Sequence, residues 1–153
     1  MDITLRKATA EDLEAMVRLL PRLADFDVPP ERNPEHLWIH DELLLRRWAD
    51  GQADQCVVHV ACVDTHVVGL TLVSMRPELL SHEPSAHLEA IAIDERVEGH
   101  GVGKRLLENA EKAAQKRGAQ SLTLHVFARN TRARRLYDGN GYHGELHRYI
   151  KFF

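Results

Sequence analysis

Two repeating patterns of apolar residues divide the chain into elements. Alternation of apolar and polar positions predicts strands, and apolar residues three or four apart predict helices. The alternating segments cover residues 3–8, 55–64, 66–75, 86–93 and 121–128, with a closing strand within 144–153. The helical segments run from Thr9 to about Leu20, over 36–49, over 105–117 and from Thr131 to about Asn140. The predicted order is therefore β α α β β β α β α β.

The connections between these elements indicate how the strands pair. Asp64 and Thr65 separate two strands, which is short enough for a hairpin, so the early strands form an antiparallel meander. The strands at 86–93 and 121–128 flank a helix, and this connection requires parallel pairing with a right-handed crossover. We therefore predict an α/β (α+β) fold with a central mixed, mostly antiparallel sheet and helices on both faces.

Composition limits the classes of partner. The 153 residues, 44% of them hydrophobic, suit one domain spanning 1–153. A formal charge of -3 provides no basic surface for nucleic acid or an anionic membrane. No apolar run approaches the roughly 20 residues of a membrane span and the opening residues lack an apolar leader, so we expect a cytoplasmic protein. Cys56 and Cys62 lie too far apart on one strand to bond, and free thiols fit a reducing compartment.

A glycine-rich turn lies between the strand at 86–93 and the helix that follows it. Gly99, Gly101 and Gly103 alternate with His100 and Val102, so the backbone can curl and point successive N–H groups inward. Together with the positive end of the helix dipole, such groups bind phosphate oxygens. Glycines also occur in turns for purely local reasons, and the pattern matches neither a P-loop nor a dinucleotide-binding turn.

Three motifs together carry a family resemblance. The chain has R-K-A-T-x-x-D near its start, I-A-I-D-E-x-x-x-G-H-G-V-G-K-R-L-L in the middle and L-T-L-H-V-F-A-R-N-T-R-A-R-R-L-Y-D-G-N-G-Y from 122 to 142. With them it resembles the GNAT superfamily of acetyl-CoA-dependent N-acetyltransferases over essentially its whole length. The most specific parts are the turn from Gly99 to Gly103 and the spacing of Asn130, Ala133, Tyr137 and Gly141-Tyr142. The resemblance implies a GNAT fold with two neighbouring strands splayed at a bulge.

The chain departs from the family pattern in two places. Glu98 stands just before the first glycine of the turn, where the family usually has Arg or Gln. This departure puts a side-chain cation beside the diphosphate in doubt, but leaves the main-chain groups in place. Only about a dozen residues follow Gly141, where many relatives have two strands. The terminal sheet is then either trimmed or completed by a second subunit, as a homodimer.

The resemblance also implies how the co-substrate acetyl-CoA is bound. Its pantetheine arm would lie along main-chain groups of Ile91, Ala92 and Ile93, with the Ile91 N–H facing the thioester carbonyl and stabilising the oxyanion. The diphosphate would lie on Gly99, His100, Gly101, Val102, Gly103 and Lys104. Asn130 matches a motif asparagine that meets the cofactor arm; its simpler interpretation is a helix N-cap.

The resemblance implies candidates for proton transfer as well. Tyr137 matches the family tyrosine that protonates the departing thiolate, although a tyrosine at this spacing is also a normal core residue. Glu89 coincides with the acidic base of some members and lies two residues before Ile91, on the same face of an ideal strand. His87 matches the position of a base in other branches. The simpler interpretation of Glu89 is a surface carboxylate paired with Lys or Arg.

The acceptor is open at this stage. Residues 22–42 hold more acidic than basic side chains, which favours a cationic amine, although a solvated acidic face explains the same composition. Small-molecule and protein amines both remain candidates. The alternative function is an inactive acyl-CoA-binding or sensor module of the same fold, an alternative that Glu98 favours. We expect no metal, since His36 and His40 have helical spacing but no third ligand.

Overall fold

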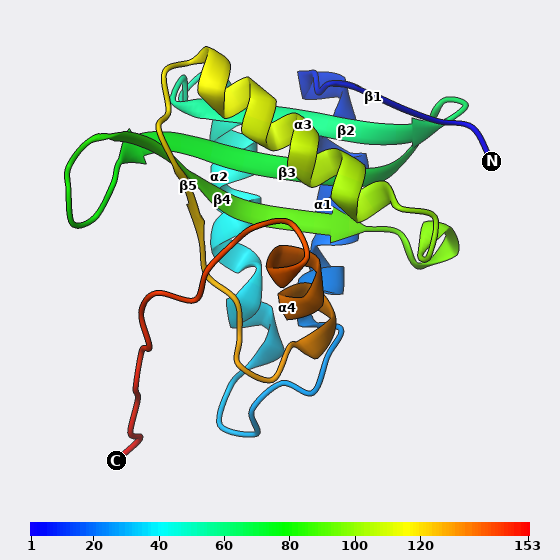
Figure 1. Cartoon of the computed structure of the whole chain (residues 1–153). Coiled ribbons are helices and arrows are strands. Elements are labelled where there is room, and N and C mark those ends of the chain that lie inside the picture. Colours follow the sequence, from blue (N-terminus) through cyan, green and yellow to red (C-terminus); the bar gives the residue numbers. More distant parts are fainter.

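The computed structural model describes residues 1–153 and contains one five-stranded sheet (Figure 1). Its strands are β1 (Ile3–Lys7), β2 (Cys56–Val63), β3 (His66–Pro77), β4 (Pro84–Ile93) and β5 (Leu122–Leu124). They lie side by side in sequence order; β1 to β4 pair antiparallel, and β4 pairs parallel with β5. The predicted mixed, mostly antiparallel sheet is confirmed.

Helices cover both faces of this sheet. They are α1 (Leu13–Leu19), α2 (Ile39–Ala49), α3 (Val102–Lys116) and α4 (Thr131–Asp138), with 3-10 turns η1 (Ala10–Asp12), η2 (Leu20–Ala24), η3 (Pro34–Leu37) and η4 (Glu95–Val97). In Figure 1, α3 crosses in front of the sheet, whereas α1 and α2 lie behind it. The α4 helix lies beside the β4 edge, below the front helix.

Apolar side chains on each face of the strands hold the layers together. Behind the sheet, Met16 and Leu20 are fully buried in one cluster with Leu45 of α2 and Leu70 and Leu72 of β3. In front, α3 contributes side chains at helical spacing, among them Leu106, Leu107, Ala110 and Ala114. Complete burial of one leucine side chain contributes about 1.5–3 kcal/mol, so both helical layers stabilise the sheet between them.

The entry into the first helix is fixed by Asp12. Its carboxylate accepts from Arg6 Nη1 and Nη2 at 2.7 and 2.9 Å, and from the Thr9 N–H at 2.8 Å. The guanidinium beside Asp12 holds the pKa of that carboxyl below its usual value. This ion pair ties β1 to the start of η1, where the sequence predicts a helix beginning after Thr9.

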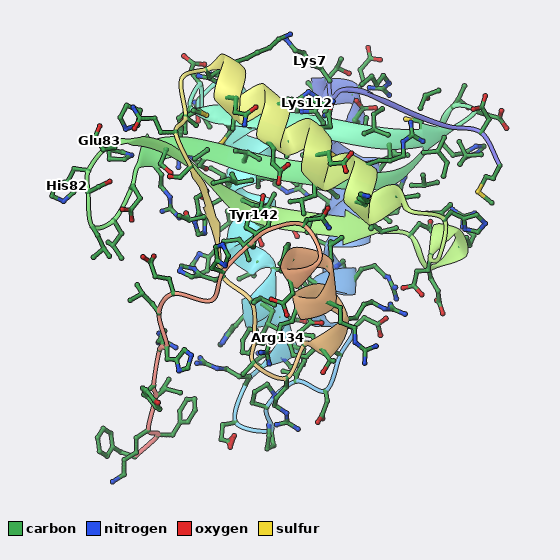
Figure 2. All side chains as sticks on the ribbon, viewed as in Figure 1. Lys7, His82, Glu83, Lys112, Arg134 and Tyr142 are labelled. Carbon is green, nitrogen blue, oxygen red and sulfur yellow. The ribbon has the colours of Figure 1, made fainter.

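Two predicted strands differ in the structure. The strand expected over 121–128 is reduced to Leu122–Leu124, because β5 pairs only with residues 86–88 before the chain turns away. The closing strand expected within 144–153 does not form, and that prediction is wrong. These residues pair with no strand, and Figure 2 shows the C-terminal segment extending away from the sheet. Its exposed apolar side chains are Leu146, Tyr149, Ile150, Phe152 and Phe153. Alternation makes a strand only where a neighbouring strand accepts its main-chain hydrogen bonds.

Two further features were addressed from the sequence. None of the helices is both long enough and apolar enough to cross a bilayer. Cys56 and Cys62 are both buried and form no disulfide, and burial raises the pKa of the Cys56 thiol. The thiols therefore behave as small core side chains.

Candidate active site

An extra residue in β4 reverses the two faces of this strand. In the register with β3, Leu88 and Ala90 face consecutive residues of the neighbouring strand, so Glu89 is left over as a bulge. Leu88 packs with the cluster under α3, whereas Ala90 packs with the cluster behind the sheet. Alternation is thus interrupted where the resemblance implies a bulge.

The bulge corrects the expected position of Glu89. In an ideal strand Glu89 and Ile91 share a face, and that expectation is wrong here. Ile91 packs against the clusters under α3, but the Glu89 carboxylate lies 3.9 Å from Arg76 Nη2 and 4.0 Å from His87 Nε2. Its charge also acts on Asp41 of α2, behind the sheet. The acid therefore faces α2, away from the Ile91 side chain.

Beyond the bulge, the main chain of β4 is open on its β5 side. β5 ends at Leu124, which pairs with Leu88, so the rest of β4 has no strand partner there. The Asp94 N–H donates to the Val68 carbonyl on the β3 side at 2.8 Å. Because main-chain groups alternate along an antiparallel strand, those of Ala92 also point to β3, while those of Ile91 and Ile93 point into the gap. Of the three residues expected to meet the pantetheine arm, two face the opening.

The turn after β4 presents a run of unoccupied main-chain donors. The N–H groups of residues 99–104 donate to no acceptor in the chain, and the first main-chain bond of α3 runs from Arg105 to Gly101. Gly99 and Gly101 have φ of +79° and +74°, values at which a side chain is strained. At Gly103 a Cβ would lie 3.0 Å from Ile93 Cδ1, so glycine lets α3 approach β4. Free N–H groups at the N-terminus of a 15-residue helix bind anions.

The side chains of the turn point elsewhere, and that of Val102 is buried in the core. His100 Nδ1 lies 3.1 Å from the Val97 carbonyl and 3.0 Å from the Glu98 carbonyl, so the ring folds back on its own turn. Lys104 Nζ lies 3.8 Å from Glu108 on the exposed face of α3. These two side chains brace the turn or lie on its surface, and the free donors of the turn belong to the main chain.

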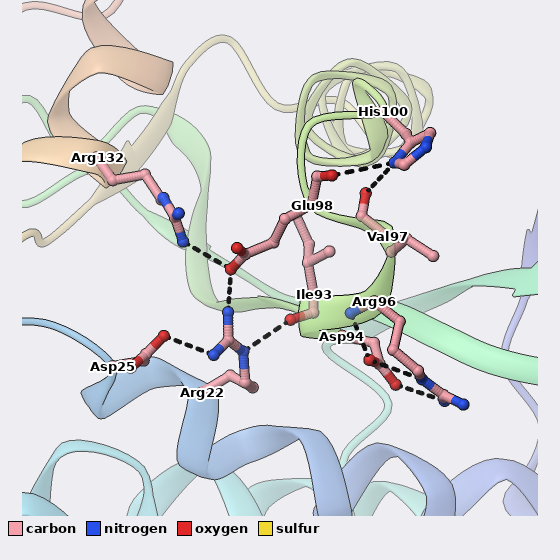
Figure 3. A network of polar contacts seen from close by, with 9 residues as sticks. All are labelled: Arg22, Asp25, Ile93, Asp94, Arg96, Val97, Glu98, His100 and Arg132. Carbon is pink, nitrogen blue, oxygen red and sulfur yellow. Dashed lines mark hydrogen bonds and ion pairs between the residues drawn. The ribbon is translucent and has the colours of Figure 1, made fainter.

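Glu98, the residue that departs from the family pattern, is neutralised by two arginines (Figure 3). Arg132 Nη1 of α4 lies 2.6 Å from Glu98 Oε1, and Arg22 Nη2 of η2 pairs with the same oxygen. Arg22 is held further by Asp25 at 2.5 Å and by the Ile93 carbonyl at 3.1 Å. The turn therefore carries no net negative charge from Glu98.

His87 is held as a neutral imidazole. Its Nδ1 lies 2.7 Å from Thr123 Oγ1, and its ring centroid is 4.8 Å from that of His125. Burial, the nearby Arg76 and His125 lower the pKa of His87 to about 4. A protonated His87 is therefore scarce at neutral pH, so this residue is a weak base for an ammonium substrate.

Asp41 is a second carboxyl group on the same side of the sheet as Glu89. Burial, with a smaller contribution from the Glu89 charge, raises the pKa of Asp41 to about 7. A carboxyl that titrates near neutral pH is matched to proton transfer. From the sequence Asp41 was only one member of an acidic run, because the effect of the Glu89 charge on it depends on how α2 packs behind the sheet.

Tyr137 lies on α4 with its ring in the cluster under α3. It is 8% exposed, and burial raises the pKa of its phenol to about 12. Its ring meets Tyr142 edge-on at 5.9 Å between centroids, and the Tyr142 hydroxyl donates to Glu111 at 2.6 Å. The Tyr137 hydroxyl has no hydrogen-bond partner in the chain, so its proton is free to be donated to a ligand.

Asn130 has the structural role that the simpler interpretation assigned to it. Its Oδ1 accepts from the Ala133 N–H at 3.3 Å and caps α4. The side-chain amide donors remain unused. The cap positions the helix that carries Tyr137 and Arg132.

Comparison with known proteins bears on this arrangement. The family model described as "Acetyltransferase (GNAT) family" matches residues 16–142, from α1 to the end of α4 and its flanking turn. The chain belongs to the GNAT acetyltransferase family. The splayed β4 and β5, the bulge and the open turn are thus features of a GNAT domain in this chain.

Individual relatives cover less of the chain. The uncharacterized N-acetyltransferase YycN of Bacillus subtilis is 34% identical over 76 residues, 50% of this chain and 47% of that protein. The mycothiol acetyltransferase of Jonesia denitrificans is 32% identical over 96 residues, 63% of this chain and 29% of that protein. The chain thus spans about half or less of the curated relatives it matches. A ribosomal-protein-alanine N-acetyltransferase structure from Brucella melitensis has a TM-score of 0.72 at 20% identity, covering 99% of this chain and 100% of the other, and shows the fold.

In this GNAT domain, much of the acidic segment 22–42 is compensated by nearby cations. Asp25 pairs with Arg22, Asp27 with Arg129, and Glu42 with Arg46. Three acids of the segment, Glu31, Glu35 and Asp41, have no ion-pair partner. The composition alone therefore overstated the negative charge of this segment, and Asp41 is the member of the segment on which the Glu89 charge acts.

Other expected or conspicuous features lie outside the site. No group of three or more His, Cys, Asp or Glu side chains is arranged to hold a metal ion. A surface hollow of about 460 Å³ is lined by residues such as Arg18, Thr65 and His66, and shares none with the cluster around Glu89. Sequence reasoning missed Arg76, Thr123 and His125, although strand alternation and the parallel register with His87 were signals for the last two.

Proposed function

We propose that this GNAT domain transfers the acetyl group of acetyl-CoA directly to the nitrogen of a primary amine. The observation that carries the proposal is the run of unused N–H groups at residues 99–104, which follows a strand whose edge is open. An anionic diphosphate suits the turn, and an extended arm suits the strand edge. Together they suit the two chemical parts of a coenzyme A thioester.

The open edge of β4 supports a position for the thioester. The N–H of Ile91 points into the gap and is proposed to donate to the thioester carbonyl oxygen. A fixed donor aimed at this oxygen stabilises the negative charge that develops during attack, and loss of such a donor commonly costs about 10²–10³-fold in kcat. The amide of Asn130 would meet the arm from the other side of the gap.

Proton transfer is divided between the two faces of β4. The amine, having lost its proton to Glu89, attacks the carbonyl carbon, a C–N bond forms and the C–S bond breaks. The departing thiolate takes the proton of Tyr137, whose raised pKa keeps the phenol protonated at neutral pH. The nitrogen of the new amide loses its remaining extra proton to solvent, and the Tyr137 phenolate takes a proton back from solvent. Both cysteines are buried, and burial raises the pKa of the Cys56 thiol, so no acyl-enzyme step is proposed.

The carboxyl groups behind the sheet support a cationic acceptor. Glu89 and Asp41 face the same space, and a nearby ammonium favours the charged form of both. Arg76 at 3.9 Å offsets part of the Glu89 charge. The proposal is therefore a cationic amine, without a choice between a small molecule and a protein.

The alternative is a binding module without turnover. Glu98 favoured it from the sequence, because a carboxylate repels a diphosphate. In the structure Arg22 and Arg132 neutralise Glu98, so this reason for an inactive site is removed. The unpartnered hydroxyl of Tyr137 favours the enzyme.

The test is a panel of mono-, di- and polyamines mixed with acetyl-CoA, with release of free thiol followed over time. We expect release that depends on an amine and falls at least about tenfold in Glu89→Gln, since one general base typically contributes about 10²–10⁴-fold. Glu83→Gln, on the exposed loop before β4, is the matched control and should retain the full rate. Binding of acetyl-CoA without thiol release from any amine would favour the binding module.

A further inference from the structure

Arg132 joins α4 to the residue that precedes the glycine-rich turn through an ion pair. Its Nη1 lies 2.6 Å from Glu98 Oε1, and its side chain is 72% exposed. Figure 3 shows this guanidinium extending from α4 to the Glu98 carboxylate, immediately before the first glycine. A cation is thus held next to the unused N–H groups of residues 99–104.

The two arginines on Glu98 differ in how firmly they are fixed. Arg22 is 23% exposed and has three partners: Glu98, Asp25 and the Ile93 carbonyl. Arg132 is held by Glu98 alone, so its guanidinium can leave without breaking another contact. If it leaves, Glu98 is still paired with Arg22 and is not stranded as a bare carboxylate.

We propose that Arg132 is a donor-binding residue that moves from Glu98 onto the diphosphate of acetyl-CoA. This inference rests on the proposed function, because it assumes that the diphosphate lies on residues 99–104. A diphosphate carries more charge than a carboxylate and accepts paired hydrogen bonds from a guanidinium, so the exchange of partners is favourable. Of the other cations near the turn, Lys104 pairs with Glu108, and Arg96 pairs with Asp94 at 2.7 Å.

The experiment compares ligands that differ in their phosphates. Dissociation constants of CoA, 3′-dephospho-CoA and pantetheine are measured by calorimetry for the wild type and Arg132→Ala. We expect Arg132→Ala to weaken CoA and 3′-dephospho-CoA equally, by about tenfold, since charge-assisted hydrogen bonds are the strong ones. Binding of pantetheine, which lacks the diphosphate, should not change. Arg132→Lys should recover part of the loss.

Arg96→Ala is the matched control. Arg96 lies in η4 just before the same turn, is 74% exposed and has the same charge as Arg132, but its guanidinium points to Asp94. Its removal tests whether general electrostatic attraction between the protein and CoA explains the binding. We expect the dissociation constant of CoA to change by less than about twofold, and added salt should abolish this change. Melting of each free variant checks that the fold is intact.

Three results would overturn the assignment of Arg132. Unchanged CoA binding in Arg132→Ala shows that it does not meet the ligand. If Arg132→Ala weakens the binding of CoA but not of 3′-dephospho-CoA, Arg132 binds the 3′-phosphate and not the diphosphate. If Arg96→Ala and Arg132→Ala weaken CoA binding equally, Arg132 contributes only its net charge. If the wild type itself binds no CoA, the proposed function fails together with this inference, whereas the first three results leave that function standing.

Discussion

Replacement of Asp41 by asparagine should stabilise the free protein above neutral pH. Asp41 is held in the folded chain with a pKa of about 7, mainly by burial and then by the charge of Glu89, against an ordinary value of 3.8. The folded state therefore binds a proton that the unfolded state has lost, from about pH 4 to about pH 7. Wild-type stability decreases as pH rises through this window, because folding opposes the ionisation of Asp41. Asparagine has no such penalty.

The size of the effect follows from the two pKa values. The rise from 3.8 to about 7 sets a ceiling of about 4 kcal/mol on the penalty above pH 7. Part of this is offset, since Asp41 lies in the first turn of α2, where a negative charge contributes about 0.3–1 kcal/mol. Partial solvent access reduces the gain further. We expect Asp41→Asn to gain about 2 kcal/mol at pH 8, or about 4–8 °C in melting temperature.

The assay is thermal melting of the free protein at pH 4 and pH 8. At pH 4 the wild-type side chain is itself protonated, so Asp41→Asn and the wild type should melt within about a degree of each other. Asp54→Asn, an exposed residue in the loop before β2, controls for the loss of one charge. A gain that is equal at the two pH values, or a loss at pH 8, would refute the burial of Asp41 beside Glu89.

Four further variants test the catalytic and binding assignments. Tyr137→Phe should leave the dissociation constant of CoA within about twofold and lower kcat by about 10²-fold or more. An unchanged kcat would show that Tyr137 is a core residue with no catalytic role. Glu89→Gln should lose most activity at neutral pH and recover as the amine deprotonates in alkali. His87→Gln should lose less, since the pKa of His87 is already about 4; a larger loss with the same alkaline recovery would transfer the role to it. Gly101→Asp should abolish thermal stabilisation by CoA, which is about 2.7 kcal/mol at 100 times the dissociation constant, and a retained shift would contradict a diphosphate site on this turn.

Local sequence patterns predicted most of the elements because the spacing of apolar residues within a segment determines whether it forms a helix or a strand. The antiparallel pairing of β2, β3 and β4 followed from short connections, and the turn followed from the spacing of Gly99, Gly101 and Gly103. The prediction of a closing strand within 144–153 was wrong because a strand needs a neighbouring strand to pair with, and an alternating sequence alone does not provide one. The aromatic side chains of this segment remain exposed, and one of them, Phe152, lies 5.2 Å from the Arg32 guanidinium.

The site was less predictable than the fold because it depends on long-range contacts. One extra residue at Glu89 moves the carboxylate from the expected face of β4 to the opposite one, and no alternation rule reveals a bulge in advance. The pairing of Glu98 with Arg22 and Arg132 joins segments that are 76 and 34 residues away. Asp41 becomes unusual only when α2 packs behind the sheet.

Direct acetyl transfer is tested most directly with acetyl-CoA labelled in its acetyl carbonyl carbon. The protein is incubated with this donor and the best amine from the panel, and the amine, the protein and free acetate are analysed by mass spectrometry. The account predicts one labelled acetyl group on the amine nitrogen for each thiol released, with no label on the protein. Label that collects on the protein before reaching the amine, or only in free acetate, would contradict it.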